Sequence, residues 1–172
     1  MTTVLLVRHG ETDWNREHRW QGWADVPLNG LGREQAAELA ARLRGVALDA
    51  VYSSDLRRAR ETAELVAAEH GLPVIPDAGL REIDVGSWSG LTRPGIEERY
   101  GGGWPADAET SEAHAARVRA AAAEILRAHP AGTVLLVTHG GTIRALLDDP
   151  LDRIDNCAVL ELRWVGERLV AA

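Results

Sequence analysis

The chain contains the segment Val4-Leu5-Leu6-Val7-Arg8-His9-Gly10-Glu11-Thr12 near its start and, 130 positions later, the segment Val134-Leu135-Leu136-Val137-Thr138-His139-Gly140-Gly141-Thr142. Seven of the nine positions are identical, whereas the flanking sequences differ, so the pair does not indicate a repeat architecture. Each apolar run is typical of a short strand that is buried on both faces of a parallel sheet. We therefore expect two buried strands, each of which presents a histidine just beyond its carboxyl end.

These two histidines predict a ligand site. Ligands bind at the carboxyl ends of the strands in open parallel sheets. Neighbouring strands lie about 4.8 Å apart, so the imidazoles of His9 and His139 could face one small group from both sides. The glycines that follow, Gly10 and Gly140, allow backbone N–H groups to approach an anion closely. The alternative is that each histidine only caps its strand and hydrogen-bonds a loop, but the matched contexts favour a shared site.

The remaining pattern predicts alternating strands and helices. Strands are expected at residues 50–52, 74–75, 134–137, 157–164 and 168–170, and helices at 31–44, from Ser54 or Asp55 to about 69, at 111–128 and at 142–147. This alternation predicts an α/β fold, a three-layer α/β/α sandwich with a mostly parallel central sheet.

The length and the absence of a linker predict one domain that spans residues 1–172. A less regular stretch around residues 86–110 contains Gly101-Gly102-Gly103 at its most flexible point. Such a stretch suits a short lid-like insertion over a site, and it equally suits a plain mobile connector.

Composition excludes several classes of function. The formal net charge is −7, and all 19 basic residues are arginines. Without lysine, a Walker-type phosphate loop, a Schiff-base mechanism and a pyridoxal-phosphate site are all excluded. The acidic balance argues against nucleic acid as a partner, because duplex binding depends on neutralising phosphates. An anionic ligand would instead need a local pocket of arginines inside a negatively charged protein.

The sequence also predicts the compartment. The apolar stretch before Arg8 is too short for a secretory signal, and no later run approaches the length that spans a membrane. Cys157 is the only cysteine, which excludes an intramolecular disulfide and zinc sites built on thiolate pairs. We expect a cytoplasmic protein with no membrane partner.

Motifs along the chain resemble those of the histidine phosphatase superfamily, the phosphoglycerate-mutase-like group. The first is Arg8-His9-Gly10-Glu11-Thr12 followed by Trp14-Asn15, and the others are Gln21-Gly22, Asp25-Val26-Pro27-Leu28-Asn29-Gly30-Leu31-Gly32, Ser53-Ser54-Asp55-Leu56-Arg57-Arg58-Ala59-Arg60-Glu61-Thr62-Ala63, Leu80-Arg81-Glu82-Ile83-Asp84-Val85-Gly86 and Thr138-His139-Gly140-Gly141. The resemblance covers nearly the whole chain, and it implies a phosphoglycerate-mutase-like fold.

The resemblance also implies the roles of individual residues. His9 would be the nucleophile, forming a phosphohistidine that water then hydrolyses. Arg8 and Arg58 would clamp the phosphate, with His139 as the second histidine on the phosphoryl oxygens, and Glu82 would be the general acid. Positions that match phosphate-binding or substrate-binding residues of relatives are Asn15, Gln21, Gly22 and Gly140.

The chemistry of these residue types supports the implied roles. An imidazole has an ordinary pKa of about 6.5, and neighbouring arginines favour its neutral, nucleophilic form. A backbone carbonyl would fix its tautomer, so that the free nitrogen points at phosphorus. Phosphoryl transfer mainly requires positioning and charge neutralisation, which the planar arginine fork supplies. We therefore expect no metal and no cofactor.

Other charged residues receive structural interpretations. Arg57 and Arg60 lie on the same helix as Arg58, where neighbouring positions point in different directions, so at most some of the three can face a phosphate. The motif match selects Arg58, and we expect the other two to form surface ion pairs with Glu61 or Glu64. The remaining histidines show no metal-ligand spacing and are expected to be exposed: His18, His70, His114 and His129.

The segment from Glu82 to Thr92 resembles the phosphatase branch, although Ser89 stands where a glutamate is usual. Mutases of the group generally carry extra basic residues, lysine among them, in a longer insertion. The segment after Leu147 is also short, and Asp148-Asp149-Pro150 follow at once, which would open the pocket and alter any dimer surface.

We therefore expect a metal-independent phosphoric monoester hydrolase that acts on small phosphorylated metabolites, as a monomer or homodimer. The alternatives are a 2,3-bisphosphoglycerate-dependent phosphoglycerate mutase and a non-catalytic phospholigand-binding module on the same fold.

Overall fold

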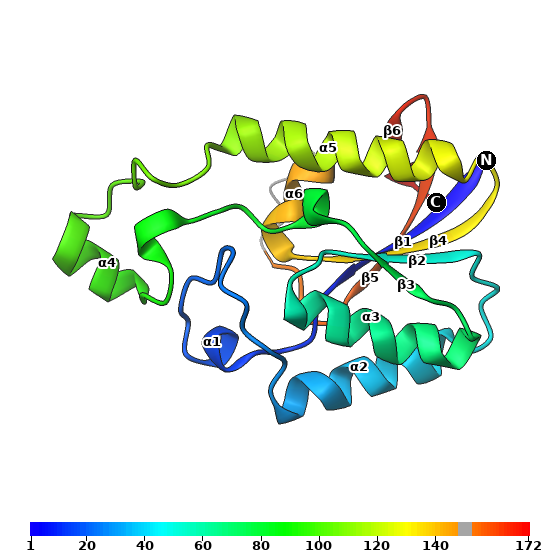
Figure 1. Cartoon of the computed structure of the whole chain (residues 1–172), viewed down its shortest axis with the longest axis horizontal. Helices are drawn as coiled ribbons and strands as arrows, with labels where there is room; N and C mark the ends of the chain where they lie inside the picture. The colour runs from blue at the N-terminus through cyan, green and yellow to red at the C-terminus, as the bar shows by residue number, and fades with distance from the viewer. Residues whose placement is uncertain (148–152) are drawn as a thin grey trace.

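A six-stranded sheet forms the centre of the computed structural model, which describes residues 1–147 and 153–172 (Figure 1). The strands are β1 (Thr2–Arg8), β2 (Ala50–Ser53), β3 (Val74–Pro76), β4 (Gly132–Thr138), β5 (Val159–Val165) and β6 (Arg168–Ala171). Their order across the sheet is β3-β2-β4-β1-β5-β6. The first four in this order run parallel, while β5 and β6 are antiparallel to their neighbours. The predicted mostly parallel sheet is confirmed.

The two matched segments form neighbouring strands in register. Val4 of β1 pairs with Val134 of β4, and the pairing continues to Arg8 and Thr138. The backbone N–H of His9 then donates to the carbonyl of Thr138 over 3.0 Å. Both histidines therefore leave the sheet at the same edge.

Helices cover both faces of this sheet. The helices of the described residues are α1 (Asp13–Arg16), α2 (Gly30–Leu43), α3 (Arg57–His70), α4 (Arg93–Tyr100), α5 (Ser111–Ala128) and α6 (Gly140–Leu147), with the short 3-10 helices η1 (Ala78–Leu80) and η2 (Gly86–Trp88). Helices α2 and α3 pack on one face, and α5 and α6 pack on the other (Figure 1). This arrangement confirms the predicted three-layer sandwich.

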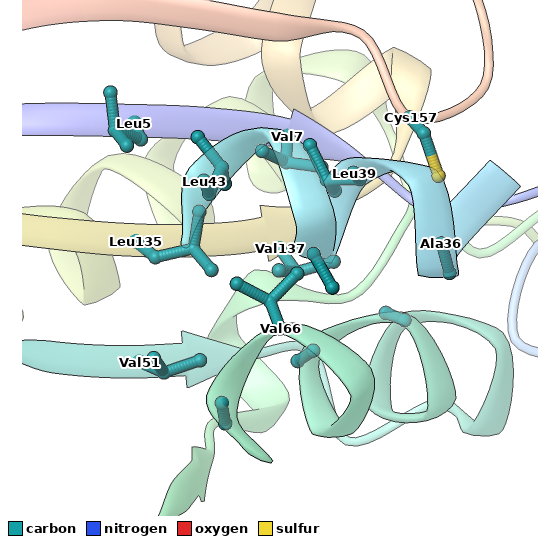
Figure 2. Close-up of a cluster of buried hydrophobic side chains, with 14 of the residues drawn as sticks. Leu5, Val7, Ala36, Leu39, Leu43, Val51, Val66, Leu135, Val137 and Cys157 are labelled. Atoms are coloured by element: carbon teal, nitrogen blue, oxygen red, sulfur yellow. The ribbon is translucent and has the colours of Figure 1, made fainter. Parts of the chain in front are cut away.

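The apolar runs are continuous because both faces of the strands are covered. Leu5 and Val7 contact the layer of α2 and α3, where Leu39 and Val66 meet them (Figure 2). Val4 and Leu6 point to the opposite face and belong to the cluster under α5 and α6. Successive strand residues alternate between the faces, and each fully buried aliphatic side chain contributes about 1.5–3 kcal/mol.

The start of α3 differs from the prediction that Ser54 or Asp55 caps it. The N-cap residue is Leu56, which makes no side-chain cap bond. The carboxylate of Asp25, from a distant loop, accepts instead from the N–H of Arg57 over 2.6 Å. The carboxylate of Asp55 is bound to the guanidinium of Arg81, so it is engaged in holding another segment.

The insertion around residues 86–110 contains more regular structure than the sequence predicts. Helix α4 begins after Thr92, whose hydroxyl accepts from the N–H of Gly95, and ends at Gly101, where φ is +63°. It is attached through Ile96, which packs against Val85 and Trp88. Figure 1 shows α4 set apart from the sheet, beyond the carboxyl ends of the strands. Whether this insertion acts as a lid stays a prediction.

Two further predictions concern the segment after Leu147 and membrane-spanning helices. The short segment that follows Leu147 in the sequence lies outside the described residues. In the described ranges, 1–147 and 153–172, the fold holds no helix whose length and apolar character would let it cross a bilayer.

Candidate active site

The fold brings His9 and His139 together at the edge where β1 and β4 end. The centroids of their rings lie 5.2 Å apart, and the ring planes meet at 61°. Both side chains are buried. The Nε2 of His139 is 2.9 Å from the hydroxyl oxygen of Ser54.

The tautomer of His9 is fixed by the backbone. Its Nδ1 lies 2.7 Å from the carbonyl oxygen of Gly10. Because a carbonyl oxygen can only accept, Nδ1 carries the hydrogen and Nε2 keeps a lone pair. Burial, assisted by the positive charges of Arg58 and Arg8, holds the pKa of His9 well below its ordinary value. The ring is therefore neutral at pH 7, with the lone pair of Nε2 available.

Two arginines supply positive charge beside this ring. Arg58 is fully buried on α3, and its two Nη groups each donate over 2.8 Å, to the carbonyls of Ala24 and Gly22. Burial lowers the pKa of Arg58 to about 10, so it remains a cation at pH 7. Arg8 donates through Nη1 to the carbonyl of Ile154.

Several buried nitrogen atoms of the site lack a hydrogen-bond partner among residues 1–147 and 153–172. They are Nε of Arg8, Nε of Arg58 and Nδ1 of His139. A buried donor left unpaired costs about 1–3 kcal/mol, and more when it is charged. Two guanidinium donors of this kind in one place indicate an anion as their partner.

The carboxyl group of Glu82 is held by backbone amides at the same site. Its Oε1 accepts from the N–H of Ile83, and its Oε2 accepts from the N–H of Gly141, each over 2.9 Å. A Cβ atom at position 141 would lie 2.3 Å from Oε1, so only glycine permits this approach. The backbone carbonyl of Glu82 accepts from Trp23 Nε1 over 2.8 Å and from Arg117 Nη2 over 3.1 Å.

A cleft of about 770 Å³ opens in front of these groups. The structure brings eight sequence-predicted site residues to its walls: Arg8, His9, Asn15, Gln21, Gly22, Arg58, Glu82 and Gly140. His139 is fully buried and is not among the residues that line the cleft. The side-chain oxygen of Gln21 accepts from the hydroxyl of Thr12 over 3.0 Å, which orients the amide.

Sequence reasoning missed Asn156, which also lines the cleft. Its Nδ2 donates to the backbone carbonyl of His9 over 2.9 Å. Asn156 lies in an irregular loop before β5, so no periodicity or spacing could have indicated it. Thr62 similarly supports the site, because its hydroxyl oxygen accepts from the N–H of Gly10 over 3.0 Å. Thr62 belongs to one of the matched motifs, so the motif could have indicated it.

The prediction that His114 is exposed is wrong. Its side chain is buried, and its Nε2 lies 4.0 Å from Oε1 of Glu82. Helix α5 turns this residue toward α6, where Nε2 is also 3.2 Å from the hydroxyl oxygen of Thr142. His18 is exposed, as expected, whereas His70 and His129 are half-buried.

The other arginines of α3 form the expected surface pairs. Arg57 binds Glu61 at 2.6 Å, and Arg60 lies 3.7 Å from Glu64. Because the side chains of Arg57 and Arg60 are about half-exposed, these ion pairs contribute little to stability.

The described part of the chain contains no group of three or more His, Cys, Asp or Glu side chains that could hold a metal ion. Burial raises the pKa of the Cys157 thiol to about 12, so this buried cysteine stays protonated at pH 7.

Known proteins resemble this chain in both sequence and fold. Residues 4–171 match the family described as histidine phosphatase superfamily (branch 1). An uncharacterized phosphatase, PhoE of Bacillus subtilis (strain 168), is 37% identical over 149 residues, which cover 87% of this chain and 77% of that protein. A probable phosphoglycerate mutase, GpmB of Enterobacter sp. (strain 638), is 33% identical, with 95% of this chain and 86% of that protein covered.

Solved structures extend the comparison. YhfR of Bacillus stearothermophilus superposes with a TM-score of 0.91 at 35% identity, covering 100% of this chain and 96% of that one. A mycobacterial glucosyl-3-phosphoglycerate phosphatase in complex with VO3 superposes with a TM-score of 0.87 at 33% identity, covering 97% and 94%. The chain therefore belongs to branch 1 of the histidine phosphatase superfamily and is an enzyme of the phosphatase type.

Proposed function

We propose that this protein hydrolyses small phosphate monoesters through a covalent phosphohistidine on His9. The observation that carries the proposal is the neutral, fixed tautomer of His9, whose Nε2 is available beside the guanidinium groups of the half-buried Arg8 and the fully buried Arg58. In the first step Nε2 forms a bond to phosphorus while the ester P–O bond breaks. The leaving oxygen takes a proton from the carboxyl group of Glu82.

The second step restores the enzyme. A water molecule attacks the phosphorus of the phosphohistidine, and the N–P bond breaks. The carboxylate of Glu82 takes the proton of that water, and inorganic phosphate leaves. The arginines neutralise the charge that spreads over the equatorial oxygens, and loss of one such donor costs about 10²–10³ in rate. A positioned general acid contributes about 10²–10⁴.

The substrate class follows from the cleft and the relatives. The cleft is large enough for a small metabolite around one phosphoryl group. A structural neighbour is named as a glucosyl-3-phosphoglycerate phosphatase, which supports including phosphorylated sugar acids among the substrates to be tested. The whole chain, residues 1–172, acts in this proposal as one catalytic domain.

Phosphoglycerate mutase activity is the second candidate function, favoured by the 33% identity to a probable phosphoglycerate mutase. A mutase must keep its phosphohistidine while the substrate reorients, so an open cleft that admits water favours hydrolysis. A purely phospholigand-binding module is less consistent with the site, because binding alone does not need a free imidazole nitrogen beside an ordered carboxyl group.

Turnover of p-nitrophenyl phosphate, with and without EDTA, tests the proposal. We expect hydrolysis that EDTA leaves unchanged, and none in His9→Ala with an unchanged circular dichroism spectrum. A panel of phosphorylated metabolites, scored for released phosphate, then ranks substrates. Conversion of 3-phosphoglycerate without phosphate release would identify a mutase instead. If the folded protein releases no phosphate from any monoester, the proposal fails and the non-catalytic phospholigand-binding module is the remaining alternative.

A further inference from the structure

The buried His114 has no role in the mechanism above, yet it faces the proposed general acid. It lies on the first turn of α5 with only 4% of its surface exposed. Its Nε2 is 3.2 Å from the hydroxyl oxygen of Thr142 and 4.0 Å from Oε1 of Glu82. The two residues that meet it therefore come from α6 and from the segment after η1.

The hydrogen bonds of Thr142 define which ring nitrogen carries a hydrogen. The hydroxyl group of Thr142 donates to the backbone carbonyl of Arg81 over 3.0 Å. Its single hydrogen is thus used, so the oxygen accepts from Nε2 of His114. The hydrogen of Nε2 therefore points to the hydroxyl oxygen of Thr142, and Oε1 of Glu82 lies 4.0 Å from the same nitrogen. At 4.0 Å the contact with Glu82 is electrostatic rather than a hydrogen bond.

The charged groups around the ring are Glu82, Arg117 and Glu109, and the last two bind each other at 2.7 Å. Burial is the largest influence on the ring and lowers the pKa of His114 below its ordinary value. The imidazole is consequently neutral at pH 7.

We propose that His114 is a positioning residue for Glu82, holding the Oε1 side of its carboxyl group with a neutral N–H dipole. The amides of Ile83 and Gly141 hold the carboxyl group from the backbone, and the His114 ring closes the side toward α5. This inference rests on the proposed function, because it gives His114 an effect only through proton donation by Glu82. The alternative is a purely structural role, in which His114 only fills space between α5 and α6.

The test compares an alkyl with an aryl substrate, β-glycerophosphate and p-nitrophenyl phosphate, because phenolates leave without much help from an acid. His114→Met removes the N–H but keeps the bulk, and Thr142 retains its bond to Arg81. We expect a roughly tenfold lower kcat for the alkyl ester and less than a twofold change for the aryl ester, by analogy with supporting residues that orient a reactive group. His114→Gln, whose amide can donate, should recover most of the loss.

The matched control is His129→Met. His129 terminates the same helix at its other end, where its Nε2 contacts the hydroxyl of Tyr52 at 3.1 Å. This substitution should leave the alkyl-to-aryl ratio of kcat unchanged. Thermal unfolding of every variant shows whether it is folded. If the methionine variant is not, His114→Asn enters the same comparison, since its shorter side chain also withdraws the N–H from Glu82.

A double-mutant cycle separates this inference from the proposed function. In a Glu82→Gln background, His114→Met should cause no further loss, because the group on which it acts is already disabled. If Glu82→Gln alone affects both esters equally, the role of Glu82 fails, whatever His114 does. If Glu82→Gln discriminates between the esters but His114→Met lowers both equally, or causes its full loss in that background, His114 is only structural and the inference is overturned.

Discussion

Acid should destabilise this fold well before its carboxylates titrate, because His9 and His139 are buried without charge, and the lowered pKa of the buried His114 acts in the same direction. The pKa values of His9 and His139 are held well below their ordinary value, in both cases mainly by burial and next by the charge of Arg58. In the unfolded chain both rings return to a pKa of about 6.5. Below that pH the unfolded state binds more protons, so stability is fully present above it and falls as the pH falls.

The magnitude follows from linkage. At about pH 5.5, one unit below the unfolded pKa, a histidine that stays neutral in the fold costs roughly 1.4 kcal/mol, and two cost roughly 2.8 kcal/mol. A domain is stable by only about 5–15 kcal/mol, so the effect is large. Carboxylates whose pKa is lowered, such as that of Asp55 in its hydrogen bonds to Arg81, titrate at lower pH. They therefore do not contribute to the loss of stability near pH 5.5.

Urea unfolding at about pH 7.5 and about pH 5.5 measures the difference directly, in phosphate-free buffer because a bound anion would stabilise the fold. His9→Asn and His139→Asn should each shrink the pH difference by roughly 1.4 kcal/mol. Leu39→Ala is the control: it should cost about 2–5 kcal/mol at both pH values and leave the difference intact. Histidine variants that keep the full wild-type difference would refute the reasoning.

Three further outcomes are expected. Glu82→Gln should lower kcat for alkyl phosphates about 10²–10⁴-fold and for aryl phosphates much less, measured by phosphate release; equal losses would remove the proton-donor role. Gly141→Ala should displace the carboxyl group of Glu82, whose Oε1 would lie 2.3 Å from the new Cβ, and so reproduce that selective loss with a nearly unchanged melting temperature. Arg58→Lys should lower kcat about 10²–10³-fold, because an ammonium cannot reproduce the forked donors, and wild-type turnover with this substitution would contradict the phosphate clamp.

The parts of the fold that sequence could predict are those that local pattern determines. The runs at Val4–Val7 and Val134–Val137 are apolar without interruption because helices cover both faces of the sheet, and they became neighbouring strands in register. Helix α5 begins and ends where the pattern places it, at Ser111 and Ala128. The matched contexts of His9 and His139 predicted that their rings would meet, and the structure places them together.

The parts that escaped prediction depend on tertiary contacts. Helix α4 contains Pro94 and Gly95 near its start and buries only Ile96, so little in its sequence favours a helix. His114 was expected at the surface because an alanine-rich helix gives little indication of which face will be buried. Asn156 reaches the carbonyl of His9 from an irregular loop before β5, so only the folded chain brings the two together.

Trapping the intermediate tests the central claim most directly. The enzyme would be mixed with substrate, quenched under alkaline conditions that preserve phosphohistidine, digested and analysed by mass spectrometry. We predict one phosphoryl group on the peptide that carries His9, and none in His9→Ala. Label on a serine, on an aspartate or on His139, or continued turnover by His9→Ala, would contradict the account.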